Sequence, residues 1–300
     1  MNSKVVAIVV TYNRSEKLAT CLTKLREQSV AVDVLIVNND STDDTLEVCQ
    51  PFLEESGWRV ITLDSNKGGA GGFAAGMKAA YEAGYEYLWL MDDDTYPDST
   101  ACEELLATFD AVKLDHGFEL GFVCSNVLWN DRSVCEMNSP GCKWDWHRFF
   151  ESEKHYINVE STSFVSVLFH RNIVSQFGLP LEEYFIWYDD VEYTKRVSRN
   201  YLCLVNLKSK VIHDLPENKG VNFQFVNDDN VWKYEYGARN EASYHFHHGR
   251  FEHLISHFRN VRRGLIRGRV KFSLRLRIYK KIIGGLFFNP KPGKVQAPHD

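Results

Sequence analysis

The chain has 300 residues, of which 44% are hydrophobic and 25% charged, a composition typical of a soluble globular protein. Its formal net charge of −5 is unevenly distributed along the chain. Residues 254–300 hold 12 Lys or Arg and one acid, Asp300, a net charge of about +11, and the residues before them therefore carry about −16. No apolar run reaches the roughly 20 residues of a membrane span, no signal-peptide pattern opens the chain, and seven scattered cysteines without a C-x-x-C pair favour reduced thiols over disulfides or structural zinc.

Apolar runs alternate with helix-like spacing over the first hundred residues. Successive β-α units of this kind predict a parallel sheet with helical crossovers. Each run ends in polar or glycine residues, so the carboxyl edge of the sheet should collect the chemistry of the protein. The runs lie at 5–10, 34–37, 59–63 and 87–91, and helical spacing covers 15–28, a segment after Asp43, and 74–83.

Beyond Pro97 the pattern changes to short apolar runs separated by aromatic-rich loops, and near His253 the composition turns basic. We therefore predict one large domain over residues 1–253, followed by a basic amphipathic helical extension over 254–300. Within the large domain, the half that binds a nucleotide should cover about 1–98 and the half that binds an acceptor about 99–253.

Three adjacent carboxylates, Asp92, Asp93 and Asp94, directly follow the fourth apolar run. Like charges repel and are costly to desolvate, which favours a divalent-cation site that holds a phosphate-bearing ligand. The alternative is a solvated acidic turn that leads to Pro97. His213 follows another apolar pair, and its imidazole is either an additional metal ligand or a structural residue.

Residues 68–72, Gly-Gly-Ala-Gly-Gly, are expected to form a loop between a strand and a helix, where backbone amides can approach a diphosphate. The motif matches neither a P-loop nor a dinucleotide fingerprint. Glycines also form tight turns, so this motif indicates phosphate binding only in combination with the other motifs.

A second acidic pair, Asp189 and Asp190, precedes a segment with helical spacing. The pair can cap that helix, and a carboxylate beside a bound substrate can also be a general base. Trp187 and Tyr188 just before it either fill the core or form a floor for a sugar. The histidines between 245 and 257 lie beside the basic segment without a Cys-containing metal motif, and we expect them at the surface or facing a partner, with zinc binding as the less favoured alternative.

Five motifs, in order and spacing, resemble glycosyltransferase family two, whose members have the GT-A fold. The resemblance covers roughly residues 5–240. The glycine motif and the second acidic motif look most like bacterial galactofuranosyltransferases, which use UDP-galactofuranose, while related members use dTDP-rhamnose. The motifs are V-V-T-Y-N-R at 9–14, V-N-N-D-S-T-D at 37–43, N-K-G-G-A-G-G-F at 66–73, D-D-D at 92–94 and W-Y-D-D-V-E at 187–192.

By position, the resemblance implies a catalytic base at Asp190 and a Mn²⁺ or Mg²⁺ site formed by Asp92, Asp94 and His213. The implied acceptor contacts are Trp187, Tyr188 and Asp189, and the implied contacts to the nucleotide-sugar are Thr11, Tyr12, Arg14, Asn38, Asp40, Asn66, Gly68, Gly69, Asp92 and Asp93.

Two departures from the family pattern stand out. The family often has Asp, which contacts the base, where this chain has Asn38, and Tyr188 is an extra residue between Trp187 and the Asp pair.

The predicted protein is an α/β enzyme with a Rossmann-like, mostly parallel sheet flanked by helices. It would transfer a sugar, with inversion, from UDP-galactofuranose to a glycan or lipid-linked acceptor in the synthesis of bacterial cell-surface polysaccharide. A rhamnosyltransferase that uses dTDP-rhamnose is the alternative within the family. A non-catalytic nucleotide- or glycan-binding module would lack one acidic motif, and a nucleotidyltransferase would carry glycine in its first loop, residues 11–15.

The basic segment at 259–281 alternates Lys and Arg with apolar residues, which suits an element lying on an anionic membrane surface. Nucleic-acid binding is the rival interpretation and is disfavoured, because the rest of the chain is acidic. We expect a cytoplasmic protein that binds peripherally to the inner face of the cell membrane and does not bind nucleic acid.

Overall fold

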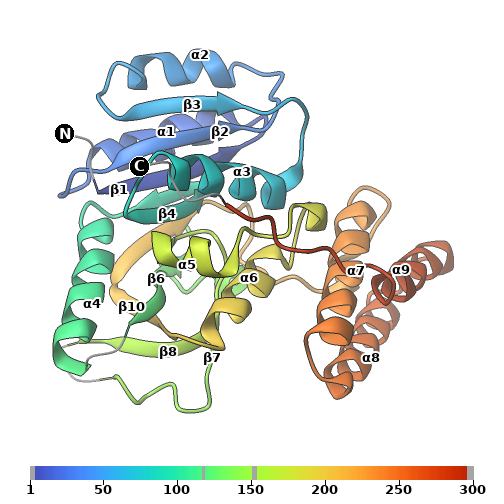
Figure 1. Cartoon of the computed structure of the whole chain (residues 1–300). Helices are drawn as coiled ribbons and strands as arrows, with labels where there is room; N and C mark the ends of the chain where they lie inside the picture. Colours follow the sequence, from blue (N-terminus) through green and yellow to red (C-terminus); the bar gives the residue numbers. More distant parts are fainter. Residues whose placement is uncertain (1–3, 117–118, 151–153, 296–300) are drawn as a thin grey trace.

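A computed structural model of the chain describes residues 4–116, 119–150 and 154–295. One sheet lies at its centre (Figure 1). Its strands are β1 (Val5–Thr11), β2 (Asp33–Asn38), β3 (Trp58–Thr62), β4 (Tyr87–Asp92), β5 (Thr95–Pro97), β6 (Leu120–Leu128), β7 (Gly141–Cys142), β8 (Tyr156–Ser161), β9 (Val167–His170) and β10 (Leu202–His213).

The strands follow the order β3-β2-β1-β4-β9-β6-β10-β8-β7, and β5 pairs with β10. The first four predicted runs form β1 to β4, and their pairings are all parallel. β9 then enters antiparallel between β4 and β6, while β6 and β10 are parallel. The predicted α/β fold with a mostly parallel central sheet is therefore confirmed.

Helices cover both faces of this sheet. Successive residues of β1 point to opposite faces, so Val5, Ala7 and Val9 join one apolar core and Val6, Ile8 and Val10 the other. The first core is closed by α1 (Ser15–Arg26), α2 (Thr45–Cys49) and α4 (Ala101–His116), and the second by α3 (Gly68–Glu82), α5 (Arg171–Phe177) and α6 (Asp189–Ser198).

The glycine motif lies inside α3, and the expectation of a loop at 68–72 is wrong. Close packing on β1 explains the difference, because a Cβ atom at Gly72 would lie 2.5 Å from Val10 Cγ1 and one at Gly76 would lie 2.4 Å from Ile8 Cγ2. The helix can approach the strand this closely only without side chains at these positions. Packing thus overrides the poor helix propensity of glycine.

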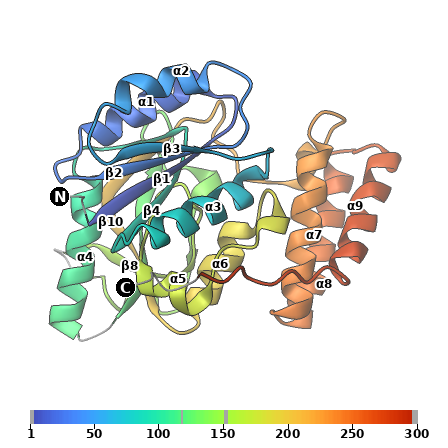
Figure 2. The ribbon, with the colours of Figure 1, turned by 45° about the horizontal axis from the view of Figure 1, so that its top comes forward.

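The last three helices, α7 (Val231–His247), α8 (Phe251–Arg267) and α9 (Phe272–Gly285), form a separate bundle beside the sheet domain (Figure 2). The three helices share one apolar core. The predicted boundary between residues 253 and 254 falls within α8, and the structure instead groups α7 with the basic segment. Within the described ranges, no helix combines the length and apolarity that a membrane span requires.

Much of the apolar pattern that predicted a membrane-binding tail is used inside this bundle. Leu265, Leu274 and Ile278 are buried in its core. After α9 the chain returns to the sheet domain, where the carbonyl of Gly293 accepts a hydrogen bond from the Leu179 N–H at 2.9 Å. The end of the predicted tail, residues 296–300, lies outside the described residues.

Two of the histidines expected at the surface are buried. His257 Nδ1 lies 3.0 Å from Glu241 Oε2, and His245 Nε2 lies 3.5 Å from Glu241 Oε1. The expectation is wrong for these two residues because α8 folds back against α7 and brings His257 to Glu241. Glu241 lies one helical turn before His245 on α7, whereas His257 reaches it only through the packing of α8 on α7.

We predict that Gly76→Val destabilises the protein by about 3 kcal/mol, the upper part of the usual range for overpacking a core. A side chain at this position would meet Ile8 and Val37 on two buried strands. Urea unfolding measures the change. Gly284→Val on α9 is the matched control, because no atom lies within 4 Å of its Cβ position. Equal stability of the two variants would contradict the packing argument.

Candidate active site

Four strands deliver polar residues to one edge of the sheet. In the pairing register, Thr11 at the end of β1 lies opposite Asn38 at the end of β2, and Val10 lies opposite Asp92 at the end of β4. His213, the last residue of β10, is brought to the same place by pairing with β5, which follows the acidic triplet directly. The predicted convergence at the carboxyl ends of the strands is present.

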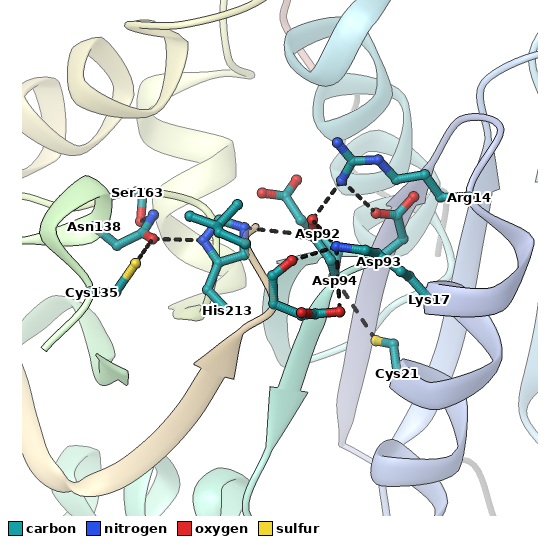
Figure 3. A network of polar contacts seen from close by, with 12 residues as sticks. Arg14, Lys17, Cys21, Asp92, Asp93, Asp94, Cys135, Asn138, Ser163 and His213 are labelled. Carbon is teal, nitrogen blue, oxygen red and sulfur yellow. Dashed lines mark hydrogen bonds and ion pairs between the residues drawn. The ribbon is translucent and has the colours of Figure 1, made fainter. Parts of the chain in front are cut away.

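Asp94 is the centre of the charge network at this edge (Figure 3). Its Oδ2 atom lies 2.6 Å from Arg14 Nη1 and 3.6 Å from Lys17 Nζ. Its Oδ1 atom lies 3.1 Å from His213 Nε2. Arg14 Nη1 also lies 3.3 Å from Asp93 Oδ1. Side chains of the protein itself therefore offset part of the charge that the acidic triplet concentrates.

The three carboxyl groups differ in their pKa values. Burial, followed by the charge of Asp94, raises the pKa of Asp92 to about 7, and burial raises the pKa of Asp93 to about 6. Burial opposes the charge of Asp94, but the hydrogen bond with His213 and the nearby cations lower its pKa. At His213 burial lowers the pKa, but the hydrogen bonds with Asp94 and Cys135 and the charges of Asp94 and Asp92 together raise it to about 9. Asp94 and His213 thus form an ion pair, whereas the charge on Asp92 is left poorly stabilised.

Asp92, Asp94 and His213 fit a divalent cation. Their ligand atoms lie within 4.8 Å of one another. Among the described residues, none donates a hydrogen bond to the Asp92 carboxylate or forms an ion pair with it, so this partly buried charge is available to a cation. Asn138 Oδ1 lies 2.7 Å from His213 Nδ1 and accepts its hydrogen, which leaves Nε2 as the coordinating nitrogen. Two carboxylates and one imidazole suit Mn²⁺ or Mg²⁺.

The loops that follow β1 and β2 are tied together. Asn13 Oδ1 accepts a hydrogen bond from the Thr42 N–H at 2.7 Å, and Asn13 N–H donates one to Ser41 Oγ at 3.0 Å. The predicted nucleotide contacts are distributed around this junction. Thr11 and Asn38 are buried, whereas Tyr12 and Asp40 are exposed at its rim.

The N-terminus of α3 lies at the same side of the sheet. Asn66 Oδ1 accepts a hydrogen bond from the Gly68 N–H at 2.8 Å. Gly68 has φ +68°, and its ideal Cβ position lies 2.0 Å from the carbonyl oxygen of Phe185, so only glycine fits there. Gly69 faces open space, with no atom within 4 Å of its Cβ position. A ligand can therefore approach the backbone of Gly69.

Asp189 and Asp190 form the first turn of α6. Asp190 Oδ1 accepts a hydrogen bond from the Val191 N–H at 2.7 Å, so it caps the helix. Burial raises the pKa of Asp190 to about 6, and burial with the charge of Asp190 raises the pKa of Asp189 far above its usual range. The charge of Asp92 contributes to the shift at Asp189. The two acidic motifs therefore lie within electrostatic range of each other.

The aromatic residues before this pair pack on α7. The ring centroids of Trp187 and Tyr234 are 4.9 Å apart, and Tyr188 Oη lies 3.4 Å from His245 Nε2. Both aromatic side chains are only partly buried. Much of the surface of these two side chains packs against the bundle, and an acceptor could contact only the part that stays exposed.

Sequence reasoning missed three residues of this site. Lys17 contacts Asp94, and Asn138 orients His213. Lys233 of α7 lies near Arg14: burial lowers the pKa of Lys233, and the positive charge of Arg14 lowers it further. Lys17 lies one helical turn after Arg14, which was a usable signal. Nothing in the sequence pattern pointed to Asn138 or Lys233, because both reach the site from distant parts of the chain.

Comparisons with known proteins agree with this geometry. Residues 6–163 match the model of the family described as "Glycosyl transferase family 2". The chain is 28% identical over 218 residues to galactofuranosyltransferase GlfT1 of Mycobacterium tuberculosis, a match that covers 67% of each protein.

Two solved structures share the fold. The structure of S. aureus TarS 1–349 in complex with UDP has a TM-score of 0.61 at 18% identity and covers 95% of this chain and 81% of that one. The structure of GalNAc-T7 with UDP, GalNAc and Mn²⁺ has a TM-score of 0.63 at 11% identity, and the match covers 97% of this chain and 58% of that one. The chain is a glycosyltransferase with the GT-A fold and belongs to glycosyl transferase family 2.

Proposed function

We propose that the chain is an inverting, metal-dependent galactofuranosyltransferase that uses UDP-galactofuranose as donor. The convergence of Asp92, Asp94 and His213 at the sheet edge that also carries Thr11 and Asn38 is the observation on which the proposal rests. The similarity to GlfT1 supports the choice of sugar, and the UDP in the TarS complex supports a uridine nucleotide. We infer a glycan or lipid-linked acceptor in cell-surface polysaccharide synthesis.

In this reaction the chain's own residues bind the donor and move one proton. Gly69 and the α3 N-terminus would receive the diphosphate, because the backbone of Gly69 is open to a ligand and the helix dipole favours anions there. Asp92, Asp94 and His213 would hold a Mn²⁺ or Mg²⁺ ion, whose charge offsets that of the departing diphosphate.

Asp190 is the proposed base. Its carboxylate would take the proton of the acceptor hydroxyl as that oxygen bonds to the anomeric carbon from the face opposite the diphosphate, whose bond to the sugar breaks. Capping through Oδ1 fixes the orientation of the carboxylate, and Oδ2 has no hydrogen bond to any other residue that the structure describes. That oxygen is therefore free for the proton.

We further propose that α8 binds the anionic inner face of the cell membrane. Phe258, Ile266 and four arginines line a groove of about 260 Å³ on α8. The arginines are exposed, and in the described part of the chain none of them has an ion-pair partner. Exposed apolar and cationic side chains together suit the interface of an anionic bilayer. The four are Arg259, Arg262, Arg263 and Arg267.

We predict that the protein consumes UDP-galactofuranose and that chelation by EDTA abolishes the reaction, with recovery on addition of Mn²⁺ or Mg²⁺. Asp92→Asn should lower the metal-stimulated rate by about 100-fold. It should leave the melting temperature unchanged, because Asp92 has no hydrogen-bond or ion-pair partner among the described residues. Release of UDP measures the rate.

Asp110→Asn on the exposed side of α4 is the control for the metal experiment. Consumption of dTDP-rhamnose alone would move the assignment to a rhamnosyltransferase. Turnover that EDTA leaves intact would contradict the metal site.

We expect Asp190→Asn to lower kcat by about 10²–10⁴-fold, the usual contribution of a general base, with the KM for the donor little changed. Because the pKa of Asp190 is raised to about 6, the carboxylate is ionised above that pH. The kcat of the unaltered protein should therefore fall as the pH drops below about 6. Near-normal turnover of a folded Asp190→Asn protein would eliminate it as the base.

Replacing Arg259, Arg262 and Arg263 by Gln should weaken binding to vesicles that contain anionic lipid. At about 1 kcal/mol for each charge, the loss is about 10²-fold in partition coefficient. Vesicle sedimentation measures it. The matched control replaces three exposed lysines of the sheet domain, and equal binding by the two triple variants would refute the proposal. The control lysines are Lys78, Lys113 and Lys208.

A further inference from the structure

The segment that leads to Asp190 has an unusual backbone. Phe185, Trp187 and Tyr188 have φ angles of +64°, +63° and +74°. Residues other than glycine avoid this left-handed region, and bulky aromatic residues are especially strained there. Such a conformation persists only where the surroundings impose it, and it often marks a functional site.

Asn240 of α7 supplies much of that constraint. Its side chain is completely buried, at 0% exposure, and its Nδ2 group donates to the carbonyl oxygens of Tyr184 at 2.9 Å, Ile186 at 3.2 Å and Trp187 at 2.9 Å. Its Oδ1 atom accepts hydrogen bonds from Arg239 at Nε, 3.0 Å, and Nη2, 2.8 Å. The amide is thus oriented by Arg239 and directed at one strained segment.

The neighbouring carbonyl groups of the segment are held as well. Arg239 Nη2 donates to the carbonyl of Glu183 at 2.7 Å. The carbonyl of Phe185 accepts a hydrogen bond at 3.2 Å from the Ala70 N–H, in the first turn of α3. The Phe185 ring also stacks on Tyr236 of α7, with centroids 4.9 Å apart and an interplanar angle of 23°. The segment therefore connects the helical bundle to the helix end where we place the donor diphosphate.

These contacts fix where α6 begins. Tyr188 is the N-cap residue of α6, and its side chain does not cap the helix, so the backbone held by Asn240 sets the first helical turn. Asp190 lies in that turn. An amide suits these contacts, because its nitrogen offers two N–H groups for the three carbonyl oxygens to share, whereas a carboxylate would repel carbonyl oxygens and an apolar residue would leave them unpaired.

We propose that Asn240 is a positioning residue for the reaction: it holds the segment 184–188, with its three positive-φ residues, in the conformation that directs the Asp190 carboxylate at the acceptor hydroxyl. The inference rests on the proposed function of Asp190 as the base. It gives the bundle a second role besides membrane contact, since α7 determines the geometry of a side chain in the sheet domain.

The test is a double-mutant cycle of Asn240→Ala and Asp190→Asn, with kcat and the donor KM measured for each protein. Asn240→Ala should lower kcat by about 10²-fold, the lower end of what a general base contributes, and leave the donor KM and Mn²⁺ affinity within about twofold. Combined with Asp190→Asn it should cause no additional loss. The acid limb of its pH profile should also shift, because the surroundings of the carboxylate change.

Ile278→Ala in the bundle core is the matched control, because Ile278 is fully buried in α9 and belongs to the same apolar core as α7. It should weaken the bundle and leave kcat unchanged. Circular dichroism checks that each variant is folded. If Asn240→Ala does not fold, Asn240→Ser retains one donor, and its kcat should fall between those of the unaltered protein and Asp190→Asn.

The outcomes separate this inference from the proposed function. If Asp190→Asn retains full kcat, the assignment of the base fails. If Asp190→Asn lowers kcat but a folded Asn240 variant retains it, or if the two losses multiply in the double variant, Asn240 does not act through Asp190 and the inference is overturned.

Discussion

The crowding of three adjacent carboxylates at one edge of a sheet, two of them buried and one partly buried, is the constraint on which this structure depends. Asp93 and Asp94 are almost inaccessible to solvent. Like charges in this setting are stable only when opposite charges face them. Arg14, Lys17 and His213 provide that charge for Asp94, whereas no cation of the described residues forms an ion pair with Asp92. The site therefore holds an excess of negative charge, which a divalent cation can neutralise.

The bundle helix α7 is the second organising element. One of its faces packs into the apolar core with α8 and α9, and another meets the segment before Asp190. Lys233 at its beginning lies near Arg14, and Asn240 further along holds the strained backbone. Helix α7 therefore connects the proposed catalytic site to the bundle whose helix α8 carries the proposed membrane contact.

Local patterns in the sequence predicted the strands β1 to β4 and the polar residues at their ends. The apolar runs that became β1 to β4 end in the predicted polar residues, and the carboxyl ends of parallel strands must meet. The residue pattern gave His213 as one of two alternatives, a metal ligand or a structural residue, and the family resemblance grouped it with Asp92 and Asp94. The strand that brings His213 to the triplet, β5, is only three residues long. Asn138 and Asn240 were invisible, since each acts across a large separation in sequence.

The wrong expectations share one cause: the elements pack against partners that are distant in sequence, and local sequence patterns do not reveal such packing. Residues 68–72 were expected to form a loop because the close approach of α3 to β1, which Gly72 permits, was unknown. Leu265 and Ile278 read as a membrane-facing stripe because the partner helices were unknown. His257 read as a surface residue because its partner, Glu241, lies on another helix.

The central claim is that a cation, a diphosphate and a base meet at one edge of the sheet. A crystal structure of the protein soaked with Mn²⁺ and UDP tests it most directly. The account predicts an anomalous manganese peak bonded to Asp92, Asp94 and His213, with the UDP diphosphate between that ion and the first turn of α3, on the side that Asp190 faces. A UDP molecule bound elsewhere, or a manganese ion without these ligands, would contradict it.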